Sequence, residues 1–335
     1  MAIYSKEEAK QILEKALSFS TADTCEINLN GSESGNIRYA RNTVSTAGHR
    51  SNQNMTVQCS YGKKSGVATI DEFDDASLKK VVKRAEELAK LSPENPEFME
   101  PLSQQEYLDS STYSASTSKI TPEFRAKVAA SSIEPAAAKD VTAAGFLYDS
   151  AVLAAMMNSK GLFAYNESTS VNFTVTMRSN DGTGSGWVTR DFNDVDKFDA
   201  EEASQIAIDK ALQSRNAKAI EPGKYTVILE PAASAQLLGN MFGSFNARRA
   251  DEGRSFMSKE GGGTKLGEKI VDERVNLWSD PQHPDVPSAP WAGDGQARKK
   301  MSWLEGGVVK NLFYGRYWAK EKGVDPIPFP SNGIM

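Results

Sequence analysis

Asn54-Met55-Thr56-Val57 recurs later in the chain as Asn172-Phe173-Thr174-Val175. A second match follows, because Ser65-Gly66-Val67-Ala68-Thr69-Ile70-Asp71 recurs as Ser185-Gly186-Trp187-Val188-Thr189-Arg190-Asp191. In each copy the first stretch alternates apolar and polar residues as a half-buried strand does, and the second leads from a turn towards a helix. This order predicts a duplicated unit. The alternative is that two strand–turn–helix segments are similar by chance.

Helix-start signals flank these strands in both copies. Ser5 and Glu8 have the spacing of a capping box, in which each side chain bonds the backbone amide of the other residue. Asp199 and Glu202 repeat that spacing. Further helices are predicted to start near Asp74 and at Thr121-Pro122, where proline takes the first helical position. We therefore expect an N-terminal α+β unit at 1–92, a polar linker at 93–119 and a second α+β unit at 120–217, each with antiparallel strands between flanking helices.

A third part begins at residue 222, after the proline and glycine of Glu221-Pro222-Gly223-Lys224. We expect Tyr225–Leu229 to form a buried strand and Pro231 to begin a helix. The apolar face of that helix is predicted to hold Leu237, Leu238, Met241, Phe242 and Phe245. The remainder has many glycines and prolines and no long helical period, which predicts turns and short strands. The fold class is therefore α+β, with two repeated units followed by a β-rich C-terminal domain at 222–335.

The composition is that of an ordinary globular protein, with 39% hydrophobic and 25% charged residues and a net charge of −5. That charge argues against a nucleic-acid partner, which needs a concentrated basic face. No stretch approaches the roughly 20 apolar residues of a membrane-spanning helix. The start, Met1-Ala2-Ile3-Tyr4, lacks the apolar core of a secretory signal, and Cys25 and Cys59 lie in strand-like stretches that favour buried free thiols. We expect a cytoplasmic protein with no membrane partner.

Few residues offer catalytic chemistry. His49, in a predicted turn, and His283, in a predicted loop, share no zinc-ligand spacing with each other or with a cysteine. No Gly-x-Ser-x-Gly elbow supports a serine triad, although a triad assembled across the fold stays open. The glycine-rich stretches 182–186 and 261–263 lack the lysine of a phosphate-binding loop and predict connections. Six carboxylates could hold a hard cation, but their spacing fits no EF-hand loop and favours a solvated acidic surface: Asp251, Glu252, Asp272, Glu273, Asp280 and Asp285.

An ordered set of motifs in the third part carries a resemblance. The motifs are Lys265-Leu266-Gly267-Glu268-Lys269-Ile270, Asn276-Leu277-Trp278-Ser279-Asp280-Pro281, Gly293-Asp294-Gly295 and Leu304-Glu305-Gly306-Gly307-Val308-Val309. In that order and spacing they resemble the C-terminal domain of the TldD/PmbA family, once called modulators of DNA gyrase. Arg38-Tyr39-Ala40-Arg41-Asn42 in the first unit agrees, so the resemblance covers essentially the whole chain.

The resemblance implies a metallopeptidase family in which active members carry His-Glu-x-x-x-His on the helix after the first strand of the third domain. Both histidines bind zinc there, and the glutamate acts on the zinc-bound water. Aligned on Leu237-Leu238 and Gly243, this chain has Gly239 and Ser244 in place of the histidines and Asn240 in place of the glutamate. Glycine offers no ligand, serine is a poor one, and asparagine cannot act as a base at neutral pH. We expect a degenerate active-site helix at Gly239, Asn240, Gly243 and Ser244, with no catalytic residue, metal ligand or cofactor in this chain.

This pattern is similar to the PmbA/TldE-like branch, and it implies a pseudoenzyme. We expect the non-catalytic subunit of a heteromeric peptidase acting on unfolded or leader peptides, with zinc in a TldD-like partner. A homodimer is the alternative assembly, and an extended peptide is the expected ligand. The alternative functions are a stand-alone peptide-binding or scaffold protein and a hydrolase with a relocated carboxylate site. Family members continue beyond the point matching Pro330–Met335, so we also expect an incomplete third domain that exposes strand edges.

Overall fold

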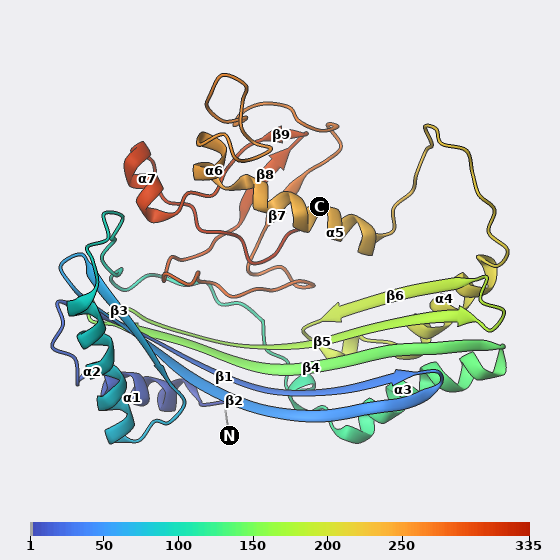
Figure 1. Cartoon of the computed structure of the whole chain (residues 1–335), viewed down its shortest axis with the longest axis horizontal. Helices are drawn as coiled ribbons and strands as arrows, with labels where there is room; N and C mark the ends of the chain where they lie inside the picture. Colours follow the sequence, from blue (N-terminus) through green and yellow to red (C-terminus); the bar gives the residue numbers. More distant parts are fainter. Residues whose placement is uncertain (1–2) are drawn as a thin grey trace.

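A curved six-stranded antiparallel sheet carries the first two thirds of the chain (Figure 1). The computed structural model describes residues 3–335, so Met1 and Ala2 of the predicted first unit and N-terminus lie outside the described residues. The strand order is β3-β2-β1-β4-β5-β6. The strands are β1 (Thr24–Ala40), β2 (Thr43–Tyr61), β3 (Lys64–Ile70), β4 (Val141–Asn158), β5 (Phe163–Ser179) and β6 (Ser185–Phe192). The strands of both predicted units thus join in one sheet through β1 and β4, and the predicted α+β class is confirmed.

Four helices pack against one face of this sheet, α1 and α2 towards one end and α3 and α4 towards the other (Figure 1). They are α1 (Lys6–Leu17), α2 (Asp75–Leu91), α3 (Pro122–Ala138) and α4 (Ala200–Gln213). Each begins where the sequence predicts, because Ser5, Asp74, Thr121 and Asp199 are the N-cap residues and each side chain accepts a backbone amide of the first turn. Ser5 and Glu8 form the complete capping box. Two hydrophobic cores result, one under each end of the sheet.

The strand register puts the matched sequence segments at equivalent places. Thr56 pairs with Thr69 in the first unit, and Thr174 pairs with Thr189 in the second. Gly66 and Gly186 also share one role. A Cβ on Gly66 would lie 2.2 Å from the Ala89 amide nitrogen in α2, and a Cβ on Gly186 would lie 2.1 Å from the Ala207 carbonyl oxygen in α4. Only glycine lets a helix approach a strand this closely, so the shared register and contact are what a duplicated unit requires.

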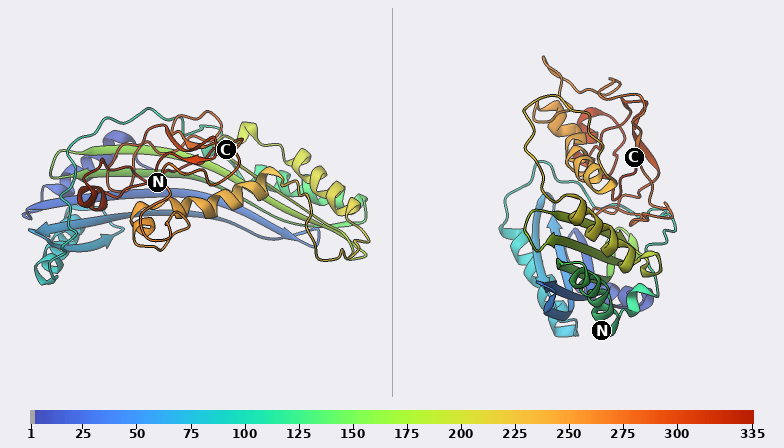
Figure 2. Two further views of the ribbon diagram at one scale, coloured as in Figure 1. Left: turned by 90° about the horizontal axis from the view of Figure 1, so that it is seen from above. Right: turned by 90° about the vertical axis from the view of Figure 1, so that its right-hand side faces the viewer.

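The third part lies over the other, concave face of the large sheet (Figures 1 and 2). Trp291 anchors it there by packing against Met156 of β4 and Ala164 of β5. Its elements are α5 (Pro231–Phe242), the 3-10 turn η3 (Gly243–Phe245), α6 (Ala247–Asp251), β7 (Leu277–Ser279), β8 (Met301–Glu305), β9 (Val308–Val309) and α7 (Arg316–Lys322). Of two more 3-10 turns, η1 (Thr117–Lys119) precedes the second unit and η2 (Val195–Lys197) lies within it, just before α4. The three short strands form one small antiparallel sheet, β7-β8-β9, among turns.

Three local predictions are wrong. Tyr225–Leu229 is not a buried strand: Ile228 is 94% exposed, and no strand within residues 3–335 pairs with the segment. A β-forming sequence has no stable strand without a neighbour to pair with. Leu237 does not join the packed face of α5, because its side chain is 59% exposed. His49 lies within β2 rather than in a turn, since the chain has already reversed at Arg41 and Asn42, whose φ angles of 53° and 56° suit a tight hairpin.

Cys25 and Cys59 are buried free thiols, as predicted. They occupy directly opposed positions on β1 and β2, with their sulfurs 3.6 Å apart. In the part of the chain that the structure describes, no helix combines the length and the apolar character needed to cross a membrane.

Candidate functional site

Helix α5 is the element on which the resemblance places the active site, and an aromatic cluster fixes it. Pro231 occupies its first turn. Leu238, Met241 and Phe242 pack against the core of the third part. The ring centroid of Trp303 in β8 lies 6.5 Å from that of Phe242 and 6.1 Å from that of Phe245, with both pairs edge-on. The helix is therefore held in place by packing on its inner side.

Of the four degenerate positions, Gly239 and Asn240 lie on α5, and Gly243 and Ser244 lie in the 3-10 turn η3 that follows it. Gly239, Asn240 and Gly243 are exposed, and Ser244 is half-buried. A Cβ at Gly239 or Gly243 would meet nothing within 4 Å, so side chains there would have room. The predicted helix start at Pro231 is confirmed, but the helix ends at Phe242, so the prediction that it continues through Gly243 and Ser244 is wrong. The polar side-chain groups offered by these positions are the Asn240 amide and the Ser244 hydroxyl.

These groups do not fit a zinc site. Zinc in proteins is bound by cysteine sulfur, histidine nitrogen or carboxylate oxygen, and the four positions supply none of these. Across residues 3–335 no group of three or more histidine, cysteine, aspartate and glutamate side chains is arranged to hold a metal ion.

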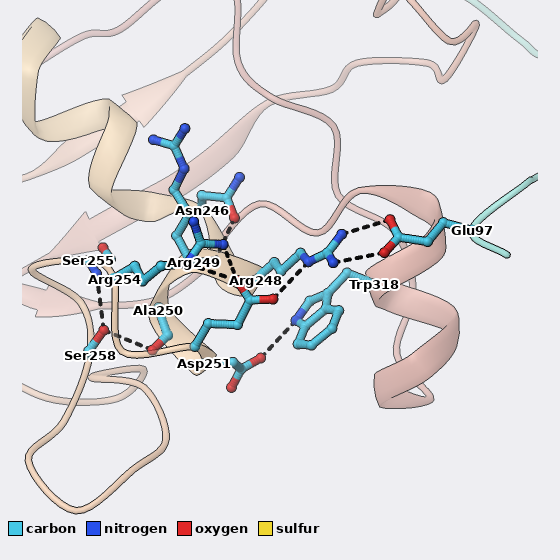
Figure 3. A network of polar contacts seen from close by, with 11 residues as sticks. Glu97, Asn246, Arg248, Arg249, Ala250, Asp251, Arg254, Ser255, Ser258 and Trp318 are labelled. Atoms are coloured by element: carbon cyan, nitrogen blue, oxygen red, sulfur yellow. Dashed lines mark hydrogen bonds and ion pairs between the residues drawn. The ribbon is translucent and has the colours of Figure 1, made fainter. Parts of the chain in front are cut away.

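A polar network fixes the segment that follows α5 (Figure 3). The Asn246 side chain accepts the Arg249 amide at 2.9 Å and so begins α6. Arg248 donates two hydrogen bonds to Glu97 of the linker, each 2.8 Å long. These bonds lower the pKa of Glu97. Sequence reasoning missed this contact because Arg248 and Glu97 are far apart in the chain, and no local pattern links them.

The six carboxylates of the alternative cation site do not converge, because each pairs with a cation of its own. The pairs are Asp251–Lys322, Glu252–Arg254, Asp272–Arg274, Glu273–Lys269, Asp280–Lys300 and Asp285–Lys197. Hydrogen bonds from Arg274 lower the pKa of Asp272 to about 2. A carboxylate that acts as a general base near neutral pH needs its pKa raised instead, so this shift runs against catalysis.

The two histidines have separate surroundings. The Nε2 atom of His49 lies 3.2 Å from a carboxylate oxygen of Glu33 on the neighbouring strand. His283 lies in a loop, as predicted, with its ring 5.5 Å from the ring of Trp278. Their partners differ, so among the described residues the two histidines do not form a catalytic pair.

A cavity of about 550 Å³ lies between the linker and the third part, and no residue of α5 is part of its lining. Leu102 and Gln105 of the linker form one wall, and Trp303 of β8 contributes to another. Residues 325–328 and 330–332 form a further side, and residues 296–299 also line the cavity. Sequence reasoning gave no signal for this cavity, because its walls come from segments that meet only in the fold.

One edge of the large sheet is open. Strand β3 pairs with β2 only from Met55 onwards, so within residues 3–335 no strand pairs with the outer edge of β2 from Thr43 to Asn54. The equivalent edge of β5, residues 163–170, is covered by the linker. There the Thr169 amide donates to the Thr112 carbonyl at 3.0 Å, and the Phe163 amide donates to the Gln104 side chain at 2.9 Å.

Three domain models of one family match most of the chain. Their descriptions are PmbA/TldA metallopeptidase domain 1, which matches residues 25–89, the central domain, which matches 117–215, and the C-terminal domain, which matches 222–331.

Two curated relatives match parts of the chain. An uncharacterized protein of Methanocaldococcus jannaschii is 33% identical over 128 residues, which are 38% of this chain and 29% of that protein. A protein of Methanothermobacter thermautotrophicus named metalloprotease is 26% identical over 181 residues, which are 51% of this chain and 38% of that protein. The matched region therefore spans well under half the length of either relative.

Solved structures share the fold across nearly the whole chain. TldE from Thermococcus kodakarensis superposes with a TM-score of 0.83 at 20% identity, covering 96% of this chain and 72% of that one. A Thermotoga maritima protein described as a candidate modulator of a DNA gyrase gives 0.85 at 18% identity, covering 96% of this chain and 74% of that one. At these identities the likeness is one of fold.

Proposed function

The chain belongs to the PmbA/TldD metallopeptidase family, and from this premise we propose that it is the non-catalytic subunit of a heteromeric peptidase. Its partner would be a TldD-like subunit that carries the zinc ligands, and the substrates would be unfolded or leader peptides. In this proposal the chain supplies shape and peptide contacts, while the partner supplies the chemistry.

The observation that carries the proposal is the state of α5. The helix keeps the packing that positions it, through Met241, Phe242 and the ring of Trp303. Its open side carries Gly239 and Asn240 where active members would carry a ligand and a base. A helix that keeps its packing and has lost its chemistry fits a structural role, as a wall of a substrate channel or as part of an interface.

The open edge of β2 supports the expectation of a partner. Its backbone from Thr43 to Asn54 offers unpaired hydrogen-bonding groups, and its side chains from Thr43 to Asn52 are exposed. Proteins commonly protect such edges with proline, charged residues or a covering segment. Here the stretch has no proline, and its charged or titratable residues are His49 and Arg50 alone. An extended strand from a second polypeptide would satisfy this edge by main-chain pairing, which accepts many sequences.

The carboxylate-based hydrolase is the weaker alternative, because each of the six carboxylates is already paired with at least one cation. A homodimer without a TldD-like partner would use the same open edge. It is therefore one outcome of the experiment that follows.

Co-expression with a TldD-like protein that carries an intact His-Glu-x-x-x-His helix tests the proposal. We expect the two chains to elute together on size exclusion, and peptidase activity on an unstructured peptide to appear only in the mixture. Ala47→Lys, at the open edge, should weaken the complex, whereas Val67→Lys, on exposed β3, should not. Separate elution at micromolar concentration, with unchanged activity of the partner, would contradict the proposal.

Metal analysis gives an independent check. After dialysis near neutral pH, elemental analysis of the purified chain alone should show zinc well below one equivalent, because the α5 positions offer no zinc ligand. About one zinc per chain would contradict the non-catalytic role.

A further inference from the structure

The cavity between the linker and the third part carries an unbalanced charge. Its lining includes three cationic side chains, Arg298, Lys299 and Arg316, and a single carboxylate, Asp325. Among residues 3–335, none of these cations lies within 4.0 Å of a carboxylate oxygen. The lining therefore has the charge that an anionic ligand would complement.

Arg298 is the most constrained of the three cations. Its Nε atom donates to the Phe329 carbonyl at 3.0 Å, and its Nη1 atom donates to the carbonyls of Ala289 and Trp291 at 3.2 and 2.6 Å. All three partners are neutral. They orient the guanidinium without compensating its charge, and Nη2 makes no hydrogen bond among the described residues.

Burial lowers the pKa of Arg298. The negative charge of Asp294 opposes that shift, although its carboxylate forms no ion pair with Arg298 and instead accepts hydrogen bonds from the backbone and side chain of Gln296. A cation partly removed from water without a countercharge is costly, and a bound anion would relieve that cost.

The remaining walls suit the body of a peptide. Leu102, Met301 and Trp303 provide apolar surface, and prolines line the side formed by the last residues: Pro326, Pro328 and Pro330. The side chain of Asn311, held by its bond to the Ser302 carbonyl at 2.7 Å, adds a polar group. The volume of about 550 Å³ lies within the range of small-ligand sites and would hold a few residues.

We propose that this cavity binds the C-terminal carboxylate of a short or unfolded peptide, with Arg298 as the main anion partner. Lys299 adds charge at the rim, and the apolar walls receive the last side chains of the peptide. The proposal rests on the proposed function only in the choice of a peptide as ligand. It can be tested on this chain alone, so the absence of a partner subunit cannot produce its failure.

Isothermal titration calorimetry of the full chain with N-acetyl-tetraalanine, compared with the same peptide as its C-terminal amide, tests the proposal. We expect the amide to bind at least about tenfold more weakly, because hydrogen bonds to a charged partner contribute roughly this much. Arg298→Gln should lose binding of the free-acid peptide to a similar extent. Arg84→Gln, on exposed α2, is the matched control and should bind as the unaltered protein does.

Because Arg298 also orders three carbonyl groups, two further variants keep the result independent of folding. Arg298→Lys keeps the charge but loses the planar fork, and it should weaken binding about threefold or more. Lys299→Gln alters an exposed residue and should weaken binding about two- to threefold. Equal affinity for the acid and the amide would overturn the proposal. The proposal would also be overturned if Arg298→Lys and Lys299→Gln both bound the free-acid peptide as tightly as the unaltered protein does. It would be overturned as well if inorganic phosphate bound as tightly as the peptide.

Discussion

The two units of the large sheet have equivalent strand pairing, but their strand edges are covered to different extents. At one end the linker covers residues 163–170 of β5, which β6 does not reach, through Thr112. At the other end, within residues 3–335, no strand covers the edge of β2 from Thr43 to Asn54. Strand pairing within each unit follows from local alternation and short turns. The covering of an edge depends on a segment from elsewhere. The difference teaches that two similar units acquire different binding properties from what lies beside them.

The interiors of the two ends differ as well. The opposed pair Cys25–Cys59 of the first unit corresponds in register to Ala143–Met177 of the second. The second end instead contains a buried ion pair, in which Arg125 of α3 donates to Asp149 of β4 at 2.6 and 2.8 Å. The same backbone pattern thus accepts thiols in one place and charges in another.

The largest expected effect comes from breaking that ion pair. Asp149→Ala leaves the Arg125 guanidinium buried without a partner, since both side chains are only 7% exposed, and should lower the free energy of unfolding by about 3–5 kcal/mol. Urea denaturation would measure this. The double variant Arg125→Met with Asp149→Leu should recover most of the loss, because replacing both charges removes the unpaired group. If the free energy of unfolding of Asp149→Ala lay within about 1 kcal/mol of that of the unaltered protein, which is the value expected for an exposed ion pair, this account would be contradicted.

The two glycines against the helices test whether the ends are equivalent. Gly66→Ala and Gly186→Ala each place a Cβ against helix backbone, so each should lower the free energy of unfolding by about 1–3 kcal/mol. Gly48→Ala is the matched control, because its Cβ would lie 3.5 Å from its nearest neighbour, the side-chain nitrogen of Asn36. Clearly unequal effects at Gly66 and Gly186 would break the equivalence.

Uncovering the β5 edge should make it behave like the open β2 edge. Thr112→Val removes the hydroxyl that donates to the Glu167 carbonyl at 2.5 Å, and should cost about 1 kcal/mol of unfolding free energy. Hydrogen exchange at residues 163–170 should become faster, approaching that of residues 43–54. Thr46→Val, at the exposed β2 edge, should change neither quantity. Unchanged exchange in Thr112→Val would show that other contacts cover the edge.

The smallest expected effect concerns a turn that differs between the units. Hydrogen bonds from Ser179 and from the backbone and side chain of Thr183 lower the pKa of Asp181 to about 2 from its ordinary 3.8. A lowered folded-state pKa stabilises the protein above about pH 4, and that contribution is lost as the pH falls towards 2. Thermal unfolding of Asp181→Asn should therefore differ from that of the unaltered protein at pH 5 and converge with it near pH 2. If the difference in thermal unfolding between Asp181→Asn and the unaltered protein grew as the pH fell, the predicted direction of the pH dependence would be wrong.

Features set by neighbouring residues were predictable from the sequence. The helix starts at Ser5, Asp74, Thr121 and Asp199 depend on side chains within three residues of each cap. The start of α5 was also predictable, because Pro231 suits the first turn of a helix.

Features set by distant contacts were not predictable. The pairing of β1 with β4 and the contact of Arg248 with Glu97 join residues that no local pattern relates. At Tyr225–Leu229 a strand was predicted that the structure does not contain. The composition of this segment favours a strand, but composition cannot say whether a neighbouring strand is present.

The exposed segment Tyr225–Leu229 connects the large sheet to the third part along the chain, but it does not hold the two parts together. It makes little contact on the way, and Ile228 is almost fully in solvent. Attachment rests on other contacts, those of Trp291 with β4 and β5 and of Arg248 with the linker. A protease that cut the chain at this tether would therefore leave a nicked protein whose two pieces stay together. The cut would become visible only when the pieces are separated by denaturation.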